Sequence, residues 1–410
     1  MPSNISISNH GTGHSSVAAG DGPQSNLNGA GTQNNYYGCT AHPNTTQGRE
    51  TESLVSSRTR PCRREVFQIG LICALPLEYD AVTLQFDQFW DEDGETYGRA
   101  PGDTNTYTTG RIGNYNVVLA LLPNMGKAAS AGAAASFRSS YSRLKLVFLV
   151  GICGGVPGTG SEQRLLGDVV ISKTVLQFDL GRQFPSKFVA KDTVEDNFSR
   201  PNKDVRSLIT SFETELGRER LRKSAGVYLE NLQGAAALKR RRCNYKYLGV
   251  AEDKLFAPAY RHKHQAPQSC TVCEEESDNY CEEAAIASCV DLNCNEGQLV
   301  PRDLLEVKKS LKPGEMQCPE IFIGRIASGD TVMKSGERRD QLAKQQNVIA
   351  FEMEGAGAWD EVPCIIIKGI CDYADSHKNK KWQPFAAATA ASVMKAVLGR
   401  YAPTDRPTRE

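Results

Sequence analysis

Three acidic side chains of the 410-residue chain each lie just beyond an apolar run of strand length. Glu78 follows the run FQIGLICAL, Glu354 lies in the segment FEMEGAG, and Asp372 lies in GICDYAD. Ligands of open α/β sheets gather at the carboxyl ends of strands, so chemistry is expected at these positions. A single acidic residue at a strand end is most often a solvated cap or turn former. Three of them on one sheet indicate a functional site.

The segments that would position these carboxylates alternate between strands and helices. Continuous apolar runs predict buried strands at residues 67–75, 117–122, 144–153, 168–172, 321–327, 348–353 and 364–371. Spacing or alanine content predicts helices at residues 77–86, 128–137 and 385–401. This alternation predicts an α/β fold, a three-layer αβα sandwich with a mixed central sheet covered on both faces. The domain spans residues 64–404 and carries a large Cys-containing insertion at about 184–318.

Residues 1–60 differ in composition from the rest of the chain. They are rich in Gly, Ser, Asn, Thr and Gln and contain few large aliphatic side chains, which predicts a tail that is disordered in isolation. Within it, the segment GAGTQNNYYG combines Gln and Asn with two tyrosines, a composition that can stack as cross-β ladders. A flexible tail is the plainer interpretation.

Charge and hydropathy exclude several classes of function. Lys and Arg together number 48 and are balanced by 48 Asp and Glu, so the basic excess typical of nucleic-acid or membrane-surface binding is absent. No apolar run approaches the ~20 residues that a membrane-spanning helix needs. The N-terminus has neither the basic segment nor the apolar core of a secretory signal. We therefore expect a cytoplasmic protein that binds neither nucleic acid nor membranes.

The insertion contains the densest group of cysteines in the chain. Two histidines and five cysteines lie close together here: His262, His264, Cys270, Cys273, Cys281, Cys289 and Cys294. A Cys-x-x-Cys with nearby His is formally a zinc pattern. The spacings after Cys273 are irregular, however, and no second Cys-x-x-Cys or His pair follows at finger spacing. The sequence favours reduced structural thiols, and neither a metal nor a cofactor is predicted.

Several segments in the same order resemble the purine nucleoside phosphorylase and methylthioadenosine/adenosylhomocysteine nucleosidase superfamily. The segments are IGLICALPLEYDAV, VGICGGV, GDVVIS, IASGDTV, FEMEGAG and GICDYADSHKNKKWQ. The similarity covers residues 66–172 and 320–402. It is greatest to the nucleoside phosphorylase-like domains of fungal NOD-like receptor type proteins, in which the pattern EDKLF…YRHKH…C-x-x-C of the insertion recurs.

The resemblance implies cleavage of a purine N-glycosidic bond. Asp372 corresponds to the acid that protonates or hydrogen-bonds purine N7, and Glu354 to the carboxylate that takes the ribose hydroxyls. Glu78 matches the nucleosidase residue that activates water. Further substrate-binding positions that the resemblance implies are Met353 under the ribose, Val332 and Trp382 beside the base, and Met125, Glu352 and Gly154.

The nucleophile distinguishes hydrolases from phosphorylases. Phosphorylases of the superfamily hold phosphate with arginines, but residues 74–78 and 148–151 contain none, and Ile152 and Cys153 occupy the glycine turn. We therefore predict an adenine-releasing nucleosidase. A phosphate-dependent phosphorylase and a catalytically idle signalling module are the alternatives, although a degenerate site should have lost at least one carboxylate.

Basic residues near the predicted site bear on the 5′ end of the substrate. If Lys378, Lys381 and Arg261 face the pocket, they could neutralise 5′-phosphates and make AMP or ATP the substrate. Two solvated basic loops are an equal alternative. The partner predictions are a purine nucleoside or nucleotide, a homo-oligomer, and a homotypic partner of the N-terminal motif in a NOD-like receptor pathway.

Overall fold

The computed structural model describes residues 60–93, 97–185, 187–191, 201–265, 270–274 and 280–402. The predicted tail, with its GAGTQNNYYG segment, lies outside the described residues apart from Arg60. Within these ranges no helix combines the length and the apolar character that crossing a bilayer requires.

A mixed sheet of nine strands forms the centre of the described fold, in the order β10-β9-β6-β11-β5-β1-β4-β3-β2. The strands are β1 (Ile69–Cys73), β2 (Gln88–Phe89), β3 (Tyr107–Ile112), β4 (Tyr115–Leu121), β5 (Leu146–Gly155), β6 (Val169–Gln177), β9 (Ile321–Ser328), β10 (Val348–Glu352) and β11 (Cys364–Asp372). Strands β1, β4, β5 and β11 run parallel to one another. Strands β6, β9 and β10 run together in the opposite direction. The predicted mixed sheet is confirmed.

The sheet also closes on itself through β5. The end of this long strand pairs with β10 in antiparallel fashion, Gly154 with Phe351 and Gly155 with Ala350. Through this pairing, β10 runs back along the last residues of β5 and reaches the region where β1 and β11 end. Glycine in the same stretch of β5 leaves room for β11, because a Cβ on Gly155 would lie 2.6 Å from the side chain of Ile370.

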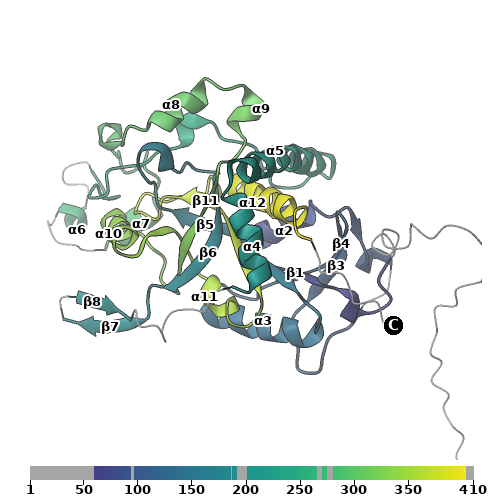
Figure 1. The fold of residues 1–410 in the computed structure, drawn as a ribbon. Helices are drawn as coiled ribbons and strands as arrows, with labels where there is room; N and C mark the ends of the chain where they lie inside the picture. Colours follow the sequence, from purple (N-terminus) through teal and green to yellow (C-terminus); the bar gives the residue numbers. More distant parts are fainter. Residues whose placement is uncertain are drawn as a thin grey trace, which may run out of the picture. The chain divides into compact units, whose positions relative to one another are not determined.

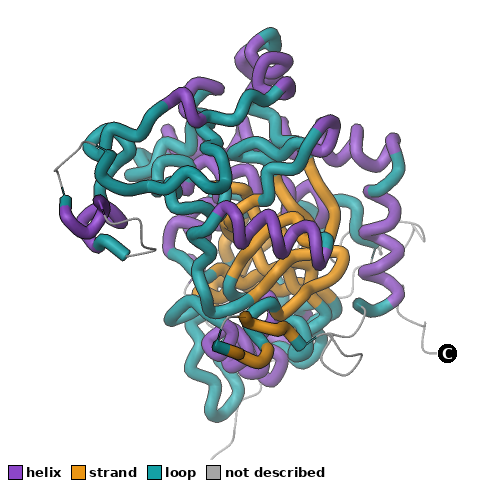
Figure 2. The backbone as a smooth tube through the Cα atoms, turned by 90° about the vertical axis from the view of Figure 1, so that its left-hand side faces the viewer, coloured by secondary structure: helices purple, strands orange, loops and turns teal. Residues whose placement is uncertain are grey.

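Helices cover both faces of the sheet (Figure 1). On one face lie α2 (Pro76–Thr83), α5 (Glu215–Leu238) and α12 (Gln383–Leu398); on the other lie α3 (Lys127–Ser140) and α11 (Gly355–Ala358). The backbones of the alanine-rich α12 and of β11 approach each other closely, since a Cβ on Gly369 would lie 2.0 Å from the carbonyl oxygen of Ala386. Figure 2 shows the strands in orange with helices around them. The three-layer prediction is confirmed.

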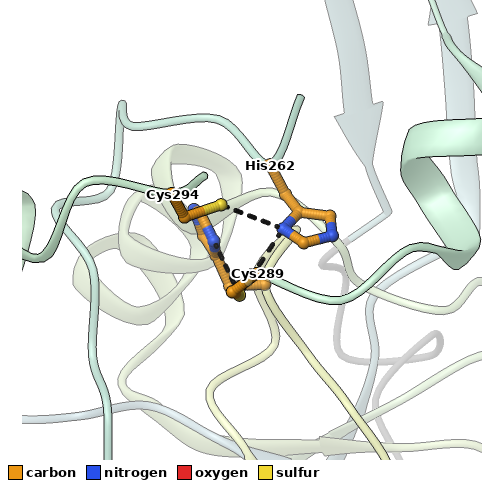
Figure 3. Close-up of side chains that lie close together, drawn as sticks. His262, Cys289 and Cys294 are labelled. Atoms are coloured by element: carbon orange, nitrogen blue, oxygen red, sulfur yellow. Dashed lines mark hydrogen bonds between the residues drawn. The ribbon is translucent and has the colours of Figure 1, made fainter. Parts of the chain in front are cut away.

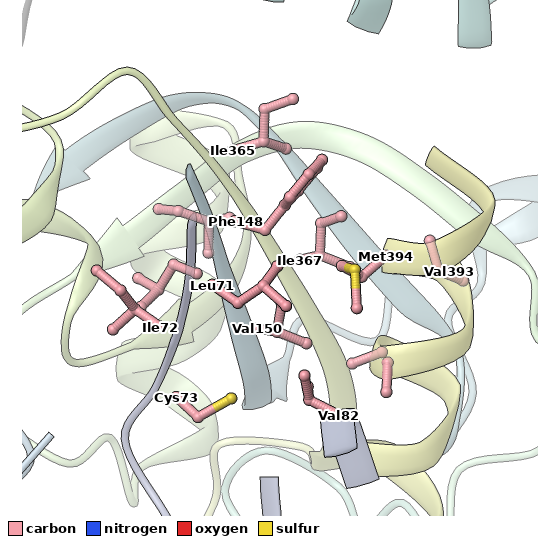
Figure 4. Packing of buried hydrophobic residues seen from close by; sticks show 14 of the residues in the cluster. Leu71, Ile72, Cys73, Val82, Phe148, Val150, Ile365, Ile367, Val393 and Met394 are labelled. Carbon is pink, nitrogen blue, oxygen red and sulfur yellow. The ribbon is translucent and has the colours of Figure 1, made fainter. Parts of the chain in front are cut away.

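The core between sheet and helices is built from the predicted apolar runs. Leu71 of β1, Phe148 of β5 and Ile367 of β11 are fully buried and belong to the same apolar cluster as Val393 and Met394 of α12 (Figure 4). Burial of aliphatic and aromatic side chains at ~25 cal/mol per Å² is the main stabilising contribution, and it fixes the strand ends that carry the candidate site.

The predicted insertion divides into two parts, one that belongs to the main core and one that contains short helices. Helices α4 (Lys203–Phe212) and α5 bury Ile209, Leu221 and Leu229 in the main core, so residues 203–238 complete the helical layer. A hairpin of β7 (Gly181–Phe184) and β8 (Lys187–Ala190) precedes them. The following region holds only short helices within its described residues: η4 (Val250–Glu252), α6 (Thr271–Glu274), α7 (Glu282–Ile286), η5 (Glu296–Gln298), α8 (Asp303–Lys309) and α9 (Pro313–Met316).

Candidate active site

A cavity of about 320 Å³ lies where β1, β5, β10 and β11 end. The three predicted carboxylates, Glu78, Glu354 and Asp372, all line it. They come from α2, from the turn after β10 and from the last residue of β11, and each is at most 5% exposed. The structure thus brings together in one cavity the three carboxylates that the sequence analysis singled out.

The strand direction on which the sequence prediction of this site depended is wrong for one of the three carboxylates, Glu354. The carboxylates were expected at a common carboxyl edge of the sheet, but β10 runs antiparallel to β5 and β11. Glu354 reaches the cavity because β10 pairs with the end of β5 at Gly154 and Gly155 and then continues toward Glu78. Closure of the sheet, rather than parallel strand direction, therefore completes the site.

Glu78 is held by backbone N–H groups on two elements. Its Oε2 accepts hydrogen bonds from the N–H groups of Ala74 and Leu75, both at 2.9 Å, and its Oε1 accepts one from Ile152 at 2.8 Å. The bond from Leu75, the N-cap residue of α2, lets the Glu78 side chain cap the start of this helix. The carboxylate lies against Gly151, where a Cβ would be 2.2 Å from Oε1. Glycine at this position leaves the space that Glu78 fills.

Burial sets the protonation behaviour of Glu78. Desolvation raises the pKa of this carboxyl above its ordinary value, while the positive charge of Lys368 and the backbone hydrogen bonds act in the opposite direction. A carboxylate with a raised pKa is a stronger base than an exposed one, which suits proton abstraction from water.

Lys368, which the sequence analysis did not single out, is a buried cation that lies among the carboxylates. Its Nζ lies 2.8 Å from Glu354 Oε2 and 3.7 Å from Glu352 Oε2, and its side chain is 1% exposed. Burial opposes the charge on Lys368, but Glu354, Glu78 and Glu352 raise its pKa above the ordinary value. The sequence held a signal, because a charged lysine within the apolar segment CIIIKGICD needs an anionic partner when that segment is buried.

Glu352 supports the turn that carries Glu354. Its carboxylate accepts hydrogen bonds from the backbone N–H groups of Glu354 at 3.0 Å and Gly355 at 2.9 Å. A Cβ on Gly355 would lie 2.6 Å from Glu352 Oε1, so glycine is required for this approach. Glu352 also lines the cavity, as predicted, and burial raises its pKa.

Asp372 is oriented by its own loop and by a lysine. Its Oδ1 accepts a hydrogen bond from the Ala374 N–H at 2.9 Å, and its Oδ2 lies 3.2 Å from Lys378 Nζ. Ala374 adopts the left-handed conformation, with φ of 52°, which costs energy for a residue with a Cβ and recurs at functional sites. Gly154 faces this carboxylate, with 2.9 Å between a Cβ there and Oδ1.

The remaining predicted site residues divide into two groups. Those that line the cavity with the carboxylates are Met125, Gly154, Val332, Met353 and Lys378. Met125 and Val332 are 52% and 45% exposed and stand at the cavity mouth. Two residues that the prediction missed, Lys380 and Gln383, also line it.

Trp382, Lys381 and Arg261 do not line this cavity, which corrects three predictions. Trp382 is 1% exposed, packs edge-on against Tyr247, and donates its indole N–H to the carbonyl oxygen of Glu252 at 3.1 Å. Lys381 pairs with Glu252 at the surface, with 3.1 Å between the charged atoms. Arg261 lines a separate cavity of about 460 Å³ in the insertion. The loop after β11 thus turns Trp382 and Lys381 away from the carboxylates, and Arg261 lies in the insertion.

Replacement of Lys368 by methionine should destabilise the fold strongly. The variant leaves Glu352 and Glu354 buried without their cation, which costs about 3–5 kcal/mol. It also removes the charge that lowers the pKa of Glu352 and Glu78, so both folded-state pKa values rise further above the unfolded ones. Stability from such groups is present at low pH and lost as the pH rises. Urea unfolding at pH 5 and pH 8 should therefore show the larger deficit at pH 8.

Lys381→Met is the matched control for this experiment, because its ion pair with Glu252 is solvated and contributes at most about 1 kcal/mol. An unfolding free energy of Lys368→Met within 1 kcal/mol of the wild type at both pH values would contradict the ion-pair assignment.

Fold and site together define an α/β protein with a carboxylate-lined pocket at the point where its sheet closes. Residues 68–229 match the Phosphorylase superfamily. A nucleotide-binding leucine-rich repeat (NLR)-like protein of Hyaloscypha variabilis is 31% identical over 340 residues, which are 82% of this chain and 29% of that protein. Aminodeoxyfutalosine nucleosidase of Helicobacter pylori is 35% identical over 83 residues, 18% of this chain and 36% of that enzyme. The family match and these relatives support membership of the nucleoside phosphorylase/nucleosidase superfamily.

Two solved structures are also similar to the chain, at low sequence identity. The 5′-methylthioadenosine/S-adenosylhomocysteine nucleosidase of Helicobacter pylori is 15% identical, with 82% of this chain and 98% of that one covered and a TM-score of 0.45. Futalosine hydrolase of the same organism is 17% identical, with the same coverage and a TM-score of 0.46. The chain spans 29% of the NLR-like protein and 36% of the aminodeoxyfutalosine nucleosidase.

Proposed function

We propose that the chain hydrolyses the N-glycosidic bond of a purine nucleoside or nucleotide and releases the free base, with adenine as the favoured base. One observation carries the proposal: Glu78, Glu354 and Asp372, buried side chains from three separate elements, line a single cavity. The nucleosidase among the relatives supports it.

Each carboxylate has a distinct part in the proposed reaction. As the bond between C1′ and the purine nitrogen breaks, its electron pair moves into the base, and Asp372 supplies a proton or hydrogen bond to N7. Glu354 accepts hydrogen bonds from the ribose hydroxyls and stabilises the positive charge that develops on the sugar. Glu78 takes a proton from water as the water oxygen bonds to C1′. The products are the free base and ribose, or ribose 5-phosphate from AMP.

The environment of Glu78 argues for water rather than phosphate as the nucleophile. The N–H groups of Ala74, Leu75 and Ile152, which could hold an anion, already donate to the Glu78 carboxylate. A phosphate dianion would meet a negative charge there instead of free donors. No arginine is found among the described residues that line the cavity, so the bidentate phosphate grip is also missing.

Release of base from a panel of nucleosides, with and without phosphate, tests the proposal. Adenosine, inosine, methylthioadenosine, AMP and ATP should be assayed, with free ribose and ribose 1-phosphate measured separately. Base release at equal rates in phosphate and in phosphate-free buffer is expected. Ribose 1-phosphate would favour the phosphorylase alternative, and no base from any member of the panel would favour the idle signalling module.

Two lysines in the cavity support a nucleotide substrate. Lys378 and Lys380, from the loop after β11, both line it, whereas Lys381 points away. If Lys380 contacts a 5′-phosphate, Lys380→Met should raise the KM for AMP about tenfold or more, the value of one charge-assisted hydrogen bond. The KM for adenosine should stay constant in the same variant. Lys381→Met is the control, and equal effects of Lys380→Met on both substrates would contradict a phosphate contact.

The likeness to an NLR-like protein supports a role in a receptor pathway. We propose that the domain acts in such a pathway by depleting a purine nucleotide. We also propose that the N-terminal motif binds a homotypic partner and that the domain self-associates in its resting form. Size-exclusion chromatography with light scattering, on the full chain and on a chain without residues 1–60, tests the self-association and whether residues 1–60 contribute to it.

A further inference from the structure

Two groups of metal-ligating side chains lie in the insertion, outside the carboxylate cavity. The first consists of His262, Cys289, Cys294 and His377, and the second of His264, Cys270, Cys273 and Cys281. In each group one nitrogen or sulfur atom per residue lies within 4.8 Å of all the others. The irregular sequence spacing concealed this arrangement, because the two histidines of the YRHKH segment, His262 and His264, belong to different groups.

The distances in the first group fit the edges of a tetrahedron. Zn–S bonds of about 2.3 Å and Zn–N bonds of about 2.0 Å put neighbouring ligand atoms about 3.3–3.8 Å apart. His262 Nδ1 lies 3.6 Å from Cys289 Sγ and 3.5 Å from Cys294 Sγ, as Figure 3 shows. His377 Nδ1 lies 3.7 Å from Cys289 Sγ. Four ligand atoms therefore surround one ion-sized space.

In the second group, which has one nitrogen and three sulfurs, the distances between ligand atoms are similar. His264 Nδ1 lies 3.4 Å from Cys273 Sγ and 4.0 Å from Cys281 Sγ, and the sulfurs of Cys270 and Cys281 are 3.9 Å apart. A disulfide requires about 2.05 Å between sulfurs. No disulfide forms among the cysteines of the described residues.

The first group also has the hydrogen bonds that orient metal-bound histidines. The Nε2 of His262 is 3.0 Å from the carbonyl oxygen of Ala287, and the Nε2 of His377 is 3.1 Å from that of Tyr260. A carbonyl oxygen can only accept, so each Nε2 carries the proton and leaves the lone pair of Nδ1 for a metal. Backbone carbonyls commonly fix metal-ligating imidazoles in this way.

In the part of this segment that the structure describes, few other features stabilise it. Its apolar cluster contains three buried residues, Cys273, Ala284 and Leu292, and one of those is itself a ligand. Its helices α6 and α7 are four and five residues long. Small segments without a sufficient core commonly depend on a structural metal.

We propose that these two groups of side chains bind two zinc ions, the first group in a His₂Cys₂ site and the second in a HisCys₃ site. Nitrogen and thiolate donors in tetrahedral sets favour zinc over the oxygen-seeking Mg²⁺ and Ca²⁺. The sites are structural, because four protein ligands leave no open position for a substrate.

The first ion fastens the catalytic loop to the insertion. His377 follows Asp372 in the loop after β11, and its neighbour Lys378 makes the ion pair with Asp372. The backbone N–H of His262 also donates a hydrogen bond to Ser376 Oγ at 3.1 Å. Zinc at this site would thus hold the loop in the conformation that presents Asp372. This consequence rests on the proposed function, whereas the zinc content does not.

Zinc content measured by plasma mass spectrometry tests the two sites. The full chain, purified under reducing conditions without chelator, offered zinc and desalted, should hold two ions per chain. Cys294→Ser and Cys273→Ser should each hold one, and Cys243→Ser, outside both groups, should hold two. Two ions in either ligand variant would overturn the proposal, and so would a wild-type chain that holds no zinc. A single ion in the wild type would overturn one site, and the variants would identify which.

Cobalt provides a second measurement that does not depend on the stability of the variants. Wild-type chain loaded with Co²⁺ should show the intense visible bands and thiolate charge-transfer absorption of tetrahedral coordination. Weak bands typical of octahedral cobalt would overturn the assignment. For the loop, His377→Ala should lose one zinc and base release together, and His377→Cys should restore the zinc. Wild-type base release by His377→Ala with one zinc would overturn only the positioning role.

Discussion

Asp372→Asn should abolish base release while the fold stays intact. An asparagine amide has the volume of the carboxyl group but cannot supply a proton to purine N7, so loss of about 10²–10⁴ in turnover is expected. The side-chain oxygen can still accept the hydrogen bond from the Ala374 N–H, which preserves the turn. Liberated base from adenosine and AMP, with the unfolding temperature of the same sample, measures both parts of the prediction.

Asp360→Asn is a suitable control, since Asp360 is an exposed residue of the turn after α11 and does not line the cavity. Turnover near the wild-type value in Asp372→Asn would remove this residue from the mechanism. A large fall in unfolding temperature would assign it a structural role through the ion pair with Lys378 instead.

The strands and the carboxylates could be predicted because both follow from local patterns. Apolar runs such as 364–371 have no stable position except in a buried strand, and β11 is buried along its whole length. The convergence of Glu78 and Asp372 follows from the parallel direction of β1, β5 and β11. These relations need only hydrophobicity and strand order.

Features that depend on pairing between distant segments were beyond prediction from the sequence. The antiparallel pairing of β10 with the end of β5, which brings in Glu354, has no local signature apart from two glycines. The apolar stripe of α5 resembles that of any surface helix, yet it completes the core against α12. His377 joins the cysteines of the insertion only because the loop after β11 returns to them. Trp382 looked like a base-stacking residue, but the same loop buries it.

Glu78→Gln should lower turnover by a factor of roughly a hundred to ten thousand, with KM changed less. The amide cannot accept a proton from water, although its oxygen can keep part of the cap on α2. Because two of the three N–H donors share Oε2, the amide group also places an N–H against at least one of them. A loss of stability of about 1 kcal/mol is therefore expected in addition. Steady-state kinetics and urea unfolding separate the two effects.

The pH dependence tests the same residue independently. Glu78 must be ionised to act as a base, and burial raises its pKa, so kcat/KM should rise with pH through a midpoint above the ordinary value for glutamate. This acid limb should disappear in Glu78→Gln. Lys368 lowers the pKa of Glu78, so the limb should move to higher pH in Lys368→Met, measured below its unfolding temperature. Unchanged turnover and an unchanged acid limb in Glu78→Gln would return Glu78 to a purely structural role as the cap of α2.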